Sequence, residues 1–389
     1  MRTYNAPKKI KIENRVVGEG GKCFIIGEIG SNHNRDKNVV RDLIDAAAEA
    51  KFDAVKFQVY DPEEAFSKNV TTADVGLESM YGKRVWWEIA RDRILMPREW
   101  FAEMFAYARK NKLIVFSTVH RVEDIEFLLE LGVGVFKIAS IDCNHLPLLK
   151  EVAKVNKPIL LSTGMATAEE IDETVKTFVN AGNKKLVLLH CVSCYPPNPK
   201  VINLRNITML SKRYGFPVGY SDHSTSNAFS VAAVALGACV IEKHITLDRK
   251  MEGPDHHFAL EPKDMQELVR SVREVETALG QEKRILSKDE LAARKMIRRS
   301  IVARREIKKG ERIALDMVKF ARPGDGITPT SLENLKDARL PKILRLRRSC
   351  PGRWFGEAMK LDHIGVVVRD LEAAKKSYQD LFGFTEFSA

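Results

Sequence analysis

The fold follows from a unit that is clearest in residues 158–192, PILLSTGMATAEEIDETVKTFVNAGNKKLVLLHCV. It begins with a short apolar run, continues into the amphipathic pattern AEEIDETVKTFV and ends in a second apolar run, LVLLHCV. Short apolar runs are typical of buried strands, and apolar residues three to four positions apart are typical of a helix. The unit therefore predicts two parallel strands joined by a helix.

The same unit recurs along most of the chain. Apolar runs that predict strands occur eight times, in residues 24–30, 53–59, 114–119, 135–140, 158–164, 186–192, 217–223 and 240–246. Eight repeats over roughly 250 residues are typical of a closed (β/α)8 TIM barrel rather than of an open doubly wound sheet. The second and third runs are unusually far apart, which predicts a long loop, about residues 60 to 98, over the mouth of the barrel.

The composition is that of an ordinary globular protein, with 389 residues of which 44% are hydrophobic and 30% charged. The apolar runs are far shorter than the ~18 residues that a membrane span needs. The N-terminal MRTYNAPKKI lacks the apolar core of a signal peptide, and six cysteines form no dense disulfide framework. We therefore expect a cytoplasmic protein with free thiols and no membrane partner.

The formal net charge of +11 is distributed unevenly. Residues 283–322 contain 14 Lys and Arg against 5 Asp and Glu, and residues 336–353 contain 7 against 1. Basic patches of this kind can bind nucleic acid, but the sequence has no motif that reads a groove and no interleaved stacking aromatics. We expect a solvated basic face, or one that attracts anionic substrates, and no nucleic-acid partner.

Polar side chains stand at the end of nearly every predicted strand. In chain order they are Glu28; Lys56 and Gln58; Ser117 and Thr118; Lys137 and Ser140; Ser162 and Thr163; His190, Ser193 and Tyr195; Ser221, Asp222 and His223; and Glu242 and His244. A single strand-end serine is often only a helix cap. Barrel enzymes, however, place catalysis at the carboxyl ends of their strands, so the set predicts one pocket for an anion that carries phosphate or carboxylate.

Two of these residues, His223 and His244, end adjacent predicted strands. Two imidazoles in such a position can hold one divalent ion and leave coordination sites open for substrate. The alternative is that each histidine is a hydrogen-bonded structural residue. Cys191 and Cys194 form a C-x-x-C beside His190, for which we prefer pocket-lining thiols over a zinc or redox site.

Eight short motifs give the sequence a specific resemblance. In order they are GEIGSNHN, VKFQ, FKIAS, STGM, a segment that ends in YP, GYSDHS, IEKHIT and EGPDHHF, and the similarity covers roughly residues 20 to 330. This series resembles that of the sialic acid synthases and the related spore-coat polysaccharide proteins. The resemblance implies metal-dependent condensation of phosphoenolpyruvate with an N-acylated aminosugar and water, giving a sialic acid-type sugar acid and phosphate. The sugar would be N-acetylmannosamine or a related diacetamido hexose.

The resemblance also implies roles for individual residues. His223 and His244 would hold a divalent ion, Mn²⁺ or Mg²⁺, and the catalytic residues would be Glu28, Asp142 and Asp255. Phosphoenolpyruvate would contact Lys56, Lys137, Ser140, Ser193 and Ser221, and the sugar would contact Gln58, Thr118 and Tyr195. The sequence departs from the family at Ile141, where glycine is common, and at Ser193, where many relatives have asparagine.

The implied domain order is an N-terminal extension (1–20), the barrel (21–282), a linker (283–294), a small antifreeze-like (SAF) domain (295–340), a basic linker (341–358) and a fragment (359–389). The fragment KLDHIGVVVRDLEAAKKSYQDLFGF resembles the start of a glyoxalase-type module, and we interpret it as a truncated fusion without lyase activity. In relatives the small domain reaches the barrel of a neighbouring subunit. Arg322 would then recognise the N-acyl group in a domain-swapped homodimer; the alternative is that it only forms a surface ion pair.

Two other functions remain open from the residues alone. One is a phosphoenolpyruvate-condensing synthase that acts on an aldose phosphate, which would need a further basic site for the distal phosphate. The other is a catalytically inactive or scaffold relative. Glu28, both lysines and both histidines favour an active enzyme.

Overall fold

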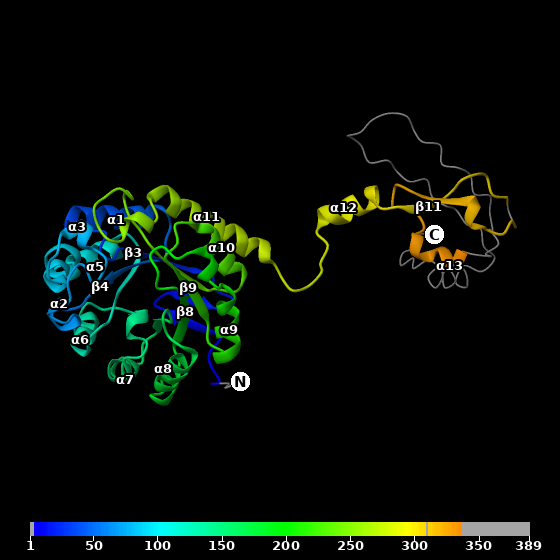
Figure 1. Cartoon of the computed structure of the whole chain (residues 1–389). Helices are drawn as coiled ribbons and strands as arrows, with labels where there is room; N and C mark the ends of the chain where they lie inside the picture. Colours follow the sequence, from blue (N-terminus) through cyan, green and yellow to red (C-terminus); the bar gives the residue numbers. More distant parts are fainter. Residues whose placement is uncertain (1–3, 309, 336–389) are drawn as a thin grey trace. The chain divides into compact units, whose positions relative to one another are not determined.

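The computed structural model describes residues 4–308 and 310–335. The chain divides into two compact units, Met1–Gly280 and Gln281–Ala389 (Figure 1). Three predictions lie wholly or partly outside the described residues: the end of the antifreeze-like domain, the basic linker 341–358 and the glyoxalase-like fragment 359–389.

The first unit is a closed barrel of eight parallel strands in the order β10-β3-β4-β5-β6-β7-β8-β9. The strands are β3 (Phe24–Glu28), β4 (Ala54–Gln58), β5 (Ile114–Thr118), β6 (Phe136–Ile138), β7 (Ile159–Ser162), β8 (Leu186–Cys191), β9 (Val218–Asp222) and β10 (Val240–His244). Each lies within one of the eight predicted runs, so the predicted (β/α)8 barrel is confirmed.

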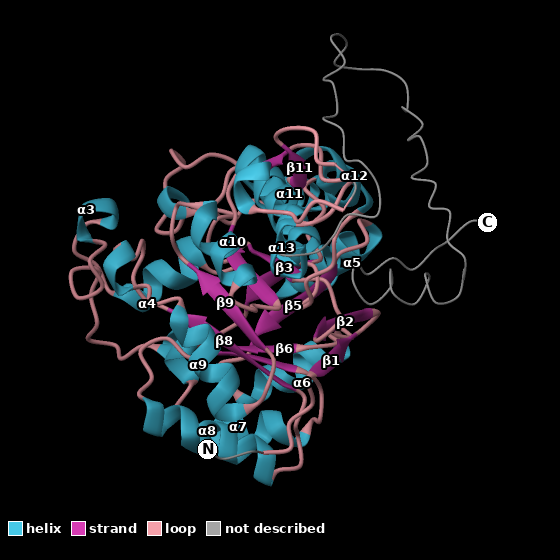
Figure 2. Cartoon of the chain, turned by 90° about the vertical axis from the view of Figure 1, so that its right-hand side faces the viewer, coloured by secondary structure: helices cyan, strands magenta, loops and turns pink. Residues whose placement is uncertain are grey.

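Helices surround the strands (Figure 2). They are α1 (Lys37–Glu49), α5 (Phe101–Lys110), α6 (Val122–Glu130), α7 (Leu146–Lys154), α8 (Ala168–Asn180), α9 (Arg205–Tyr214), α10 (Asn227–Ala235) and α11 (Pro262–Leu279). In α8, Thr167 and Glu170 form a capping box that satisfies the first backbone N–H groups. The same helix buries Ile171, Val175 and Phe178, the apolar positions of its repeat, against the barrel.

An N-terminal hairpin covers the end of the barrel that lies away from the strands' carboxyl termini. Its strands β1 (Lys9–Ile12) and β2 (Arg15–Gly18) are antiparallel, and Ile10, Ile12 and Val17 are buried in the barrel core. Arg15 forms an ion pair of 2.6 Å with Asp53, which directly precedes β4. The sequence analysis had assigned these residues only to an extension, and the structure makes them part of the core.

The long connection between β4 and α5 contains short helical turns rather than a plain loop. They are α2 (Pro62–Ala65), α3 (Glu78–Tyr81), α4 (Trp86–Ile89), a π-turn (Ala90–Ile94) and a 3-10 turn (Arg98–Trp100). Trp86, Ile89, Ala90 and Ile94 form a small apolar cluster of their own. The connection is therefore a packed structure with its own core.

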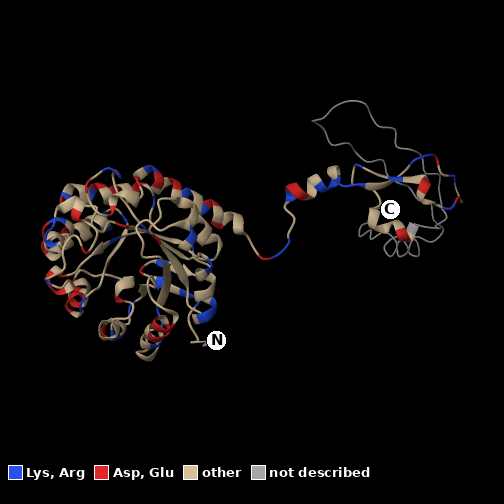
Figure 3. Cartoon of the chain, in the orientation of Figure 1, with Lys and Arg blue, Asp and Glu red and all other residues tan. Residues whose placement is uncertain are grey.

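The second unit contains α12 (Lys288–Ile297), the antiparallel strands β11 (Ser300–Ala303) and β12 (Val318–Ala321), and α13 (Leu332–Leu335). Ala303, Ile307, Ile313 and Val318 form its small core. Segment 283–294, expected as a linker, includes most of α12, and Lys and Arg recur along this unit (Figure 3). Among the described residues, no helix is both long and apolar enough to span a bilayer.

Candidate active site

The carboxyl ends of the barrel strands surround a pocket of about 260 Å³, and every one of the eight strands contributes a lining residue. Eleven predicted site residues line it: Glu28, Lys56, Gln58, Thr118, Lys137, Ser140, Ser193, Tyr195, Ser221, His223 and His244. The register of the sheet brings them together, since Glu28 lies level with His244 on one neighbouring strand and with Lys56 on the other. A larger hollow of about 840 Å³ lies beside α9 on the outside of the helices and contains none of these residues.

One wall of the pocket is a cradle of hydroxyl groups around Gly164. A Cβ atom at this position would lie 2.6 Å from Ser193 Oγ and 2.8 Å from Ser140 Oγ, so only glycine leaves both hydroxyls room to converge. The backbone N–H of Gly164 donates to Ser140 Oγ at 3.0 Å. Ser193 Oγ is buried and has no hydrogen-bond partner among the described residues. The cradle therefore has free capacity for an anionic ligand.

Lys137 provides the positive charge of this wall. Its side chain is buried, and Nζ donates to Ser162 Oγ at 2.7 Å and to the carbonyl oxygen of Ile138 at 2.9 Å. Burial lowers the pKa of Lys137, and nearby Glu242 opposes that effect. A buried ammonium group is stabilised by a bound anion, so this wall is suited to phosphate or carboxylate.

The carboxylates of Glu28 and Glu242 line the pocket together with Lys56. Lys56 forms an ion pair with Glu28, and its Nζ atom is 3.7 Å from Glu242 Oε1. Burial raises the pKa of Glu28, although Lys56 opposes the rise. Gln58 Nε2 donates to Glu28 Oε1 at 2.7 Å and fixes the orientation of that carboxylate. Glu28 is therefore a buried carboxylate with a raised pKa and a fixed orientation, which is what a general base requires.

The rings of His223 and His244 lie edge-on to each other, with centroids 5.5 Å apart. Burial lowers the pKa of His223 to about 4 and that of His244 to about 3, so both rings are uncharged at neutral pH, as metal ligands must be. His223 Nδ1 is 3.0 Å from the carbonyl oxygen of Val192, to which it donates, so Nε2 is the atom with which this ring could bind a metal.

In the described part of the chain, the two histidines are not part of a larger cluster of potential metal ligands. Within residues 4–308 and 310–335, no group of three or more His, Cys, Asp or Glu side chains could hold a metal ion. The two imidazoles fit a divalent ion whose remaining coordination positions are filled by water and substrate oxygens. His190 is engaged elsewhere, since its Nε2 atom is 2.6 Å from the carbonyl oxygen of Ile202.

Three predicted residues do not line the pocket. Asp142 lies behind His120, with its Oδ2 atom 2.6 Å from His120 Nδ1. Asp255 accepts a hydrogen bond of 2.8 Å from Ser31 and lies 3.7 Å from His244 Nδ1. Arg322 is exposed and directly follows β12 in the second unit.

The sequence analysis missed several residues of the pocket. Tyr60, Phe66 and His120 line it but were not predicted, and Glu242 was noted at its strand end without a role. His120 stands two residues beyond β5, where the rule that selected the other strand ends also applies. Glu242 and His244 are two residues apart on β10, so their side chains point to the same face of the sheet.

The chain is similar to known proteins over most of its length. Residues 43–284 match the model of the NeuB family and residues 298–337 match that of the SAF domain. The chain is 37% identical to the N,N'-diacetyllegionaminic acid synthase of Campylobacter jejuni, over 80% of this chain and 94% of that protein. It is 38% identical to the human N-acetylneuraminate-9-phosphate synthase, over 82% of this chain and 89% of that protein.

A solved structure is similar as well. The N-acetylneuraminic acid synthetase of Leptospira borgpetersenii, crystallised with citrate, is 35% identical, with a TM-score of 0.66 over 74% of this chain and 95% of that one.

Proposed function

The chain belongs to the NeuB family, and from that premise we propose that it condenses phosphoenolpyruvate with an N-acylated aminosugar. Water is consumed and phosphate is released, and the product is a nonulosonic acid of the sialic acid type. The observation that carries the proposal is the pocket itself, in which an anion cradle, a buried carboxylate and two uncharged imidazoles converge.

We assign phosphoenolpyruvate to the wall formed by Lys137, Ser140 and Ser193. Lys137 supplies the charge, and the two hydroxyls around Gly164 supply hydrogen bonds to phosphate or carboxylate oxygens. Ser221 on β9 and Lys56 on β4 also line the pocket, where Ser221 can donate a further hydrogen bond and Lys56 supplies a second positive charge. Neutralisation allows this anion to approach a second electron-rich substrate.

His223 and His244 would hold a divalent ion, Mn²⁺ or Mg²⁺, which when bound polarises the sugar aldehyde as a Lewis acid. In the reaction, C3 of phosphoenolpyruvate forms a bond to the aldehyde carbon, and the aldehyde oxygen takes up a proton. Water then forms a bond to C2, and the bond between C2 and the phosphate oxygen breaks. We propose that Glu28 accepts the proton from that water, because its pKa is raised and Gln58 fixes its orientation.

We further propose a cytoplasmic homodimer in which Arg322 of the partner subunit contacts the acyl oxygen of the sugar. The support is that the SAF domain match includes Arg322 and that its side chain is exposed. A sugar without phosphate is favoured over an aldose phosphate, because the described lining residues include no arginine and both lining lysines lie near carboxylates. N-acetylmannosamine and diacetamido hexoses are both candidate substrates.

The test is phosphate release from phosphoenolpyruvate by the purified full chain with Mn²⁺ or Mg²⁺. The reactions contain no sugar, N-acetylmannosamine, a diacetamido hexose or an aldose phosphate, each with and without a chelator. Release that needs both an N-acylated sugar and a metal is the expected result. Release only with the aldose phosphate, or none with any sugar from folded protein, would contradict the proposal.

A further inference from the structure

His120 and Asp142 form a hydrogen-bonded pair at the edge of the pocket. His120 follows β5, and Asp142 ends the 3-10 turn Ser140–Asp142 that follows the neighbouring strand β6. His120 Nδ1 and Asp142 Oδ2 are 2.6 Å apart, and the side chains are only 13% and 12% exposed. Of the two residues, only His120 lines the pocket.

The pair lies across the barrel from the histidines that would hold the metal. In the closed sheet, β5 is separated from β9 by three strands in either direction, so His120 faces the pocket from the side opposite His223. The hydroxyl cradle follows β6, β7 and β8, so it occupies the wall of the pocket between His120 and His223. A sugar whose aldehyde lies at the histidine pair therefore extends toward the β4 and β5 side, where His120 lies.

The surroundings of His120 are largely apolar. The ring of Tyr60 lies edge-on to it, with centroids 5.4 Å apart, and Phe66 packs edge-on against Tyr60 at 6.1 Å. Ala65, the residue before Phe66, and Ile141, the residue before Asp142, also line the pocket. This wall can hold a methyl group, and the imidazole places a polar atom within it.

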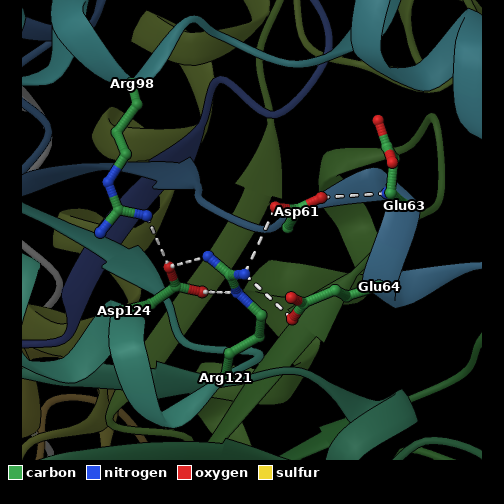
Figure 4. A network of polar contacts seen from close by, with 6 residues as sticks. All are labelled: Asp61, Glu63, Glu64, Arg98, Arg121 and Asp124. Carbon is green, nitrogen blue, oxygen red and sulfur yellow. Dashed lines mark hydrogen bonds and ion pairs between the residues drawn. The ribbon is translucent and has the colours of Figure 1, made fainter.

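The ion pairs in Figure 4 hold this wall in place. Arg121, the residue after His120, pairs with Glu64 at 3.0 Å and with buried Asp124 at 3.2 Å. Glu64 belongs to α2, the turn that brings Ala65 and Phe66 to the pocket. His120 and the apolar wall are thereby fixed relative to each other before a ligand binds.

The bond to Asp142 determines which atom His120 offers to a ligand. A carboxylate only accepts, so Nδ1 of His120 carries a proton, and in the neutral form of the ring Nε2 presents its lone pair as an acceptor. An acylamino group has an N–H donor beside an apolar methyl group. The guanidinium of an arginine only donates and can bind only the acyl oxygen, so the N–H needs an acceptor of this kind.

We propose that His120 recognises the sugar by accepting a hydrogen bond from an acylamino N–H, whose acyl methyl packs against Phe66 and Ile141, and that Asp142 is a positioning residue that acts through His120. This inference rests on the proposed function and gives Asp142 a role different from direct contact with the substrate. It also identifies the wall of the pocket that selects an acylated sugar over the parent hexose.

The experiment compares wild type with His120→Phe, which keeps an aromatic ring beside Tyr60, and His120→Gln, which restores an acceptor. Asp142→Asn and the double variant Asp142→Asn, His120→Phe complete a double-mutant cycle. The control is His145→Phe, because His145 is exposed and lies outside the pocket. Melting temperatures verify folding. The readouts are kcat/KM for N-acetylmannosamine and for mannose, and KM for phosphoenolpyruvate.

We expect His120→Phe to lower kcat/KM for N-acetylmannosamine about 10- to 100-fold, the typical loss when a substrate donor is left unpaired. The value for mannose and KM for phosphoenolpyruvate should change less than about twofold, and His120→Gln should recover part of the loss. Asp142→Asn should be harmful in the wild type but nearly silent in the His120→Phe background, because the two residues act as one unit.

Equal losses for both sugars, or a loss confined to phosphoenolpyruvate, would overturn the assignment of His120. An equal cost of Asp142→Asn in both backgrounds would show that Asp142 contacts the substrate directly. If the wild type turns over no sugar, the proposed function fails, and calorimetric binding of N-acetylmannosamine then decides the inference. Binding that is lost in His120→Phe would support it, and binding that is unchanged or absent from wild type would overturn it.

Discussion

The two sides of the pocket are built in different ways. One side consists of the ends of β6 to β10, β3 and β4 and the turns that follow β6 to β10, so its hydroxyls, both lysines, Glu28 and the two histidines are held by the barrel. The other side depends on the long connection after β4, which has its own apolar cluster and is tied to the barrel by the ion pairs of Arg121.

We expect the strand-end side to carry out the reaction and the side built on the connection to select the sugar. Strand ends cannot shift without disturbing the whole sheet, so they suit groups that must keep an accurate geometry at the reacting atoms. A connection that is fixed by a few ion pairs can differ between proteins at little cost to the barrel. Substitutions on the two sides should therefore have effects of different size and on different kinetic constants.

The largest effect is expected from His223→Ala or His244→Ala on the strand-end side. Loss of a metal ligand should reduce turnover by more than about 10³-fold, because polarisation of the aldehyde contributes several kcal/mol. The measurement is phosphate release across a titration of Mn²⁺ and Mg²⁺, with circular dichroism to verify the fold and His145→Ala as the control. Rates like those of the wild type in either metal-stripped variant would contradict the metal assignment.

Lys137→Ala should come next. It removes the buried charge of the anion cradle, so KM for phosphoenolpyruvate should rise by about 10²-fold while KM for the sugar changes little. Lys154→Ala is the matched control, since that lysine pairs with Glu151 on the exposed surface of α7. A variant in which only the sugar constant changed would show that the anion lies elsewhere.

Gly164→Ala probes the same cradle by filling it. The added methyl group would lie 2.6 Å from Ser193 Oγ, so the hydroxyls must move apart. We expect KM for phosphoenolpyruvate to rise about tenfold, as for a displacement of well-placed donors. KM for the sugar serves as the internal reference, and an unchanged constant for phosphoenolpyruvate would place the anion away from Gly164.

The smallest effect is expected from Arg121→Met on the connection side. Buried Asp124 keeps Arg98 as a partner at 2.9 Å, so the free energy of unfolding should fall by only about 1–2 kcal/mol. KM for the sugar should rise a few-fold, and KM for phosphoenolpyruvate should stay unchanged. Arg213→Met, which breaks an exposed pair with Asp172, should alter neither constant. A change in the phosphoenolpyruvate constant alone would mean that the two sides are not independent.

Most of the barrel could be predicted because its signals are local. Each strand is a short apolar run, each helix is a periodic pattern, and a catalytic side chain at a strand end is recognisable from the residues beside it. Eleven of the predicted site residues line the pocket for this reason. The hairpin of β1 and β2 was missed because its strands have only four residues each and, although KIKI in β1 alternates strictly, RVVG in β2 does not.

What the sequence by itself determined is the (β/α)8 architecture and the set of groups gathered at the mouth of the barrel. The tertiary structure alone decided which of those groups act together: Asp142 behind His120, Glu242 near both lysines, and two hydroxyls converging over Gly164. These relations join residues of different strands. They depend on the register and closure of the sheet, and no pattern of neighbouring residues in the chain encodes a distance between strand ends.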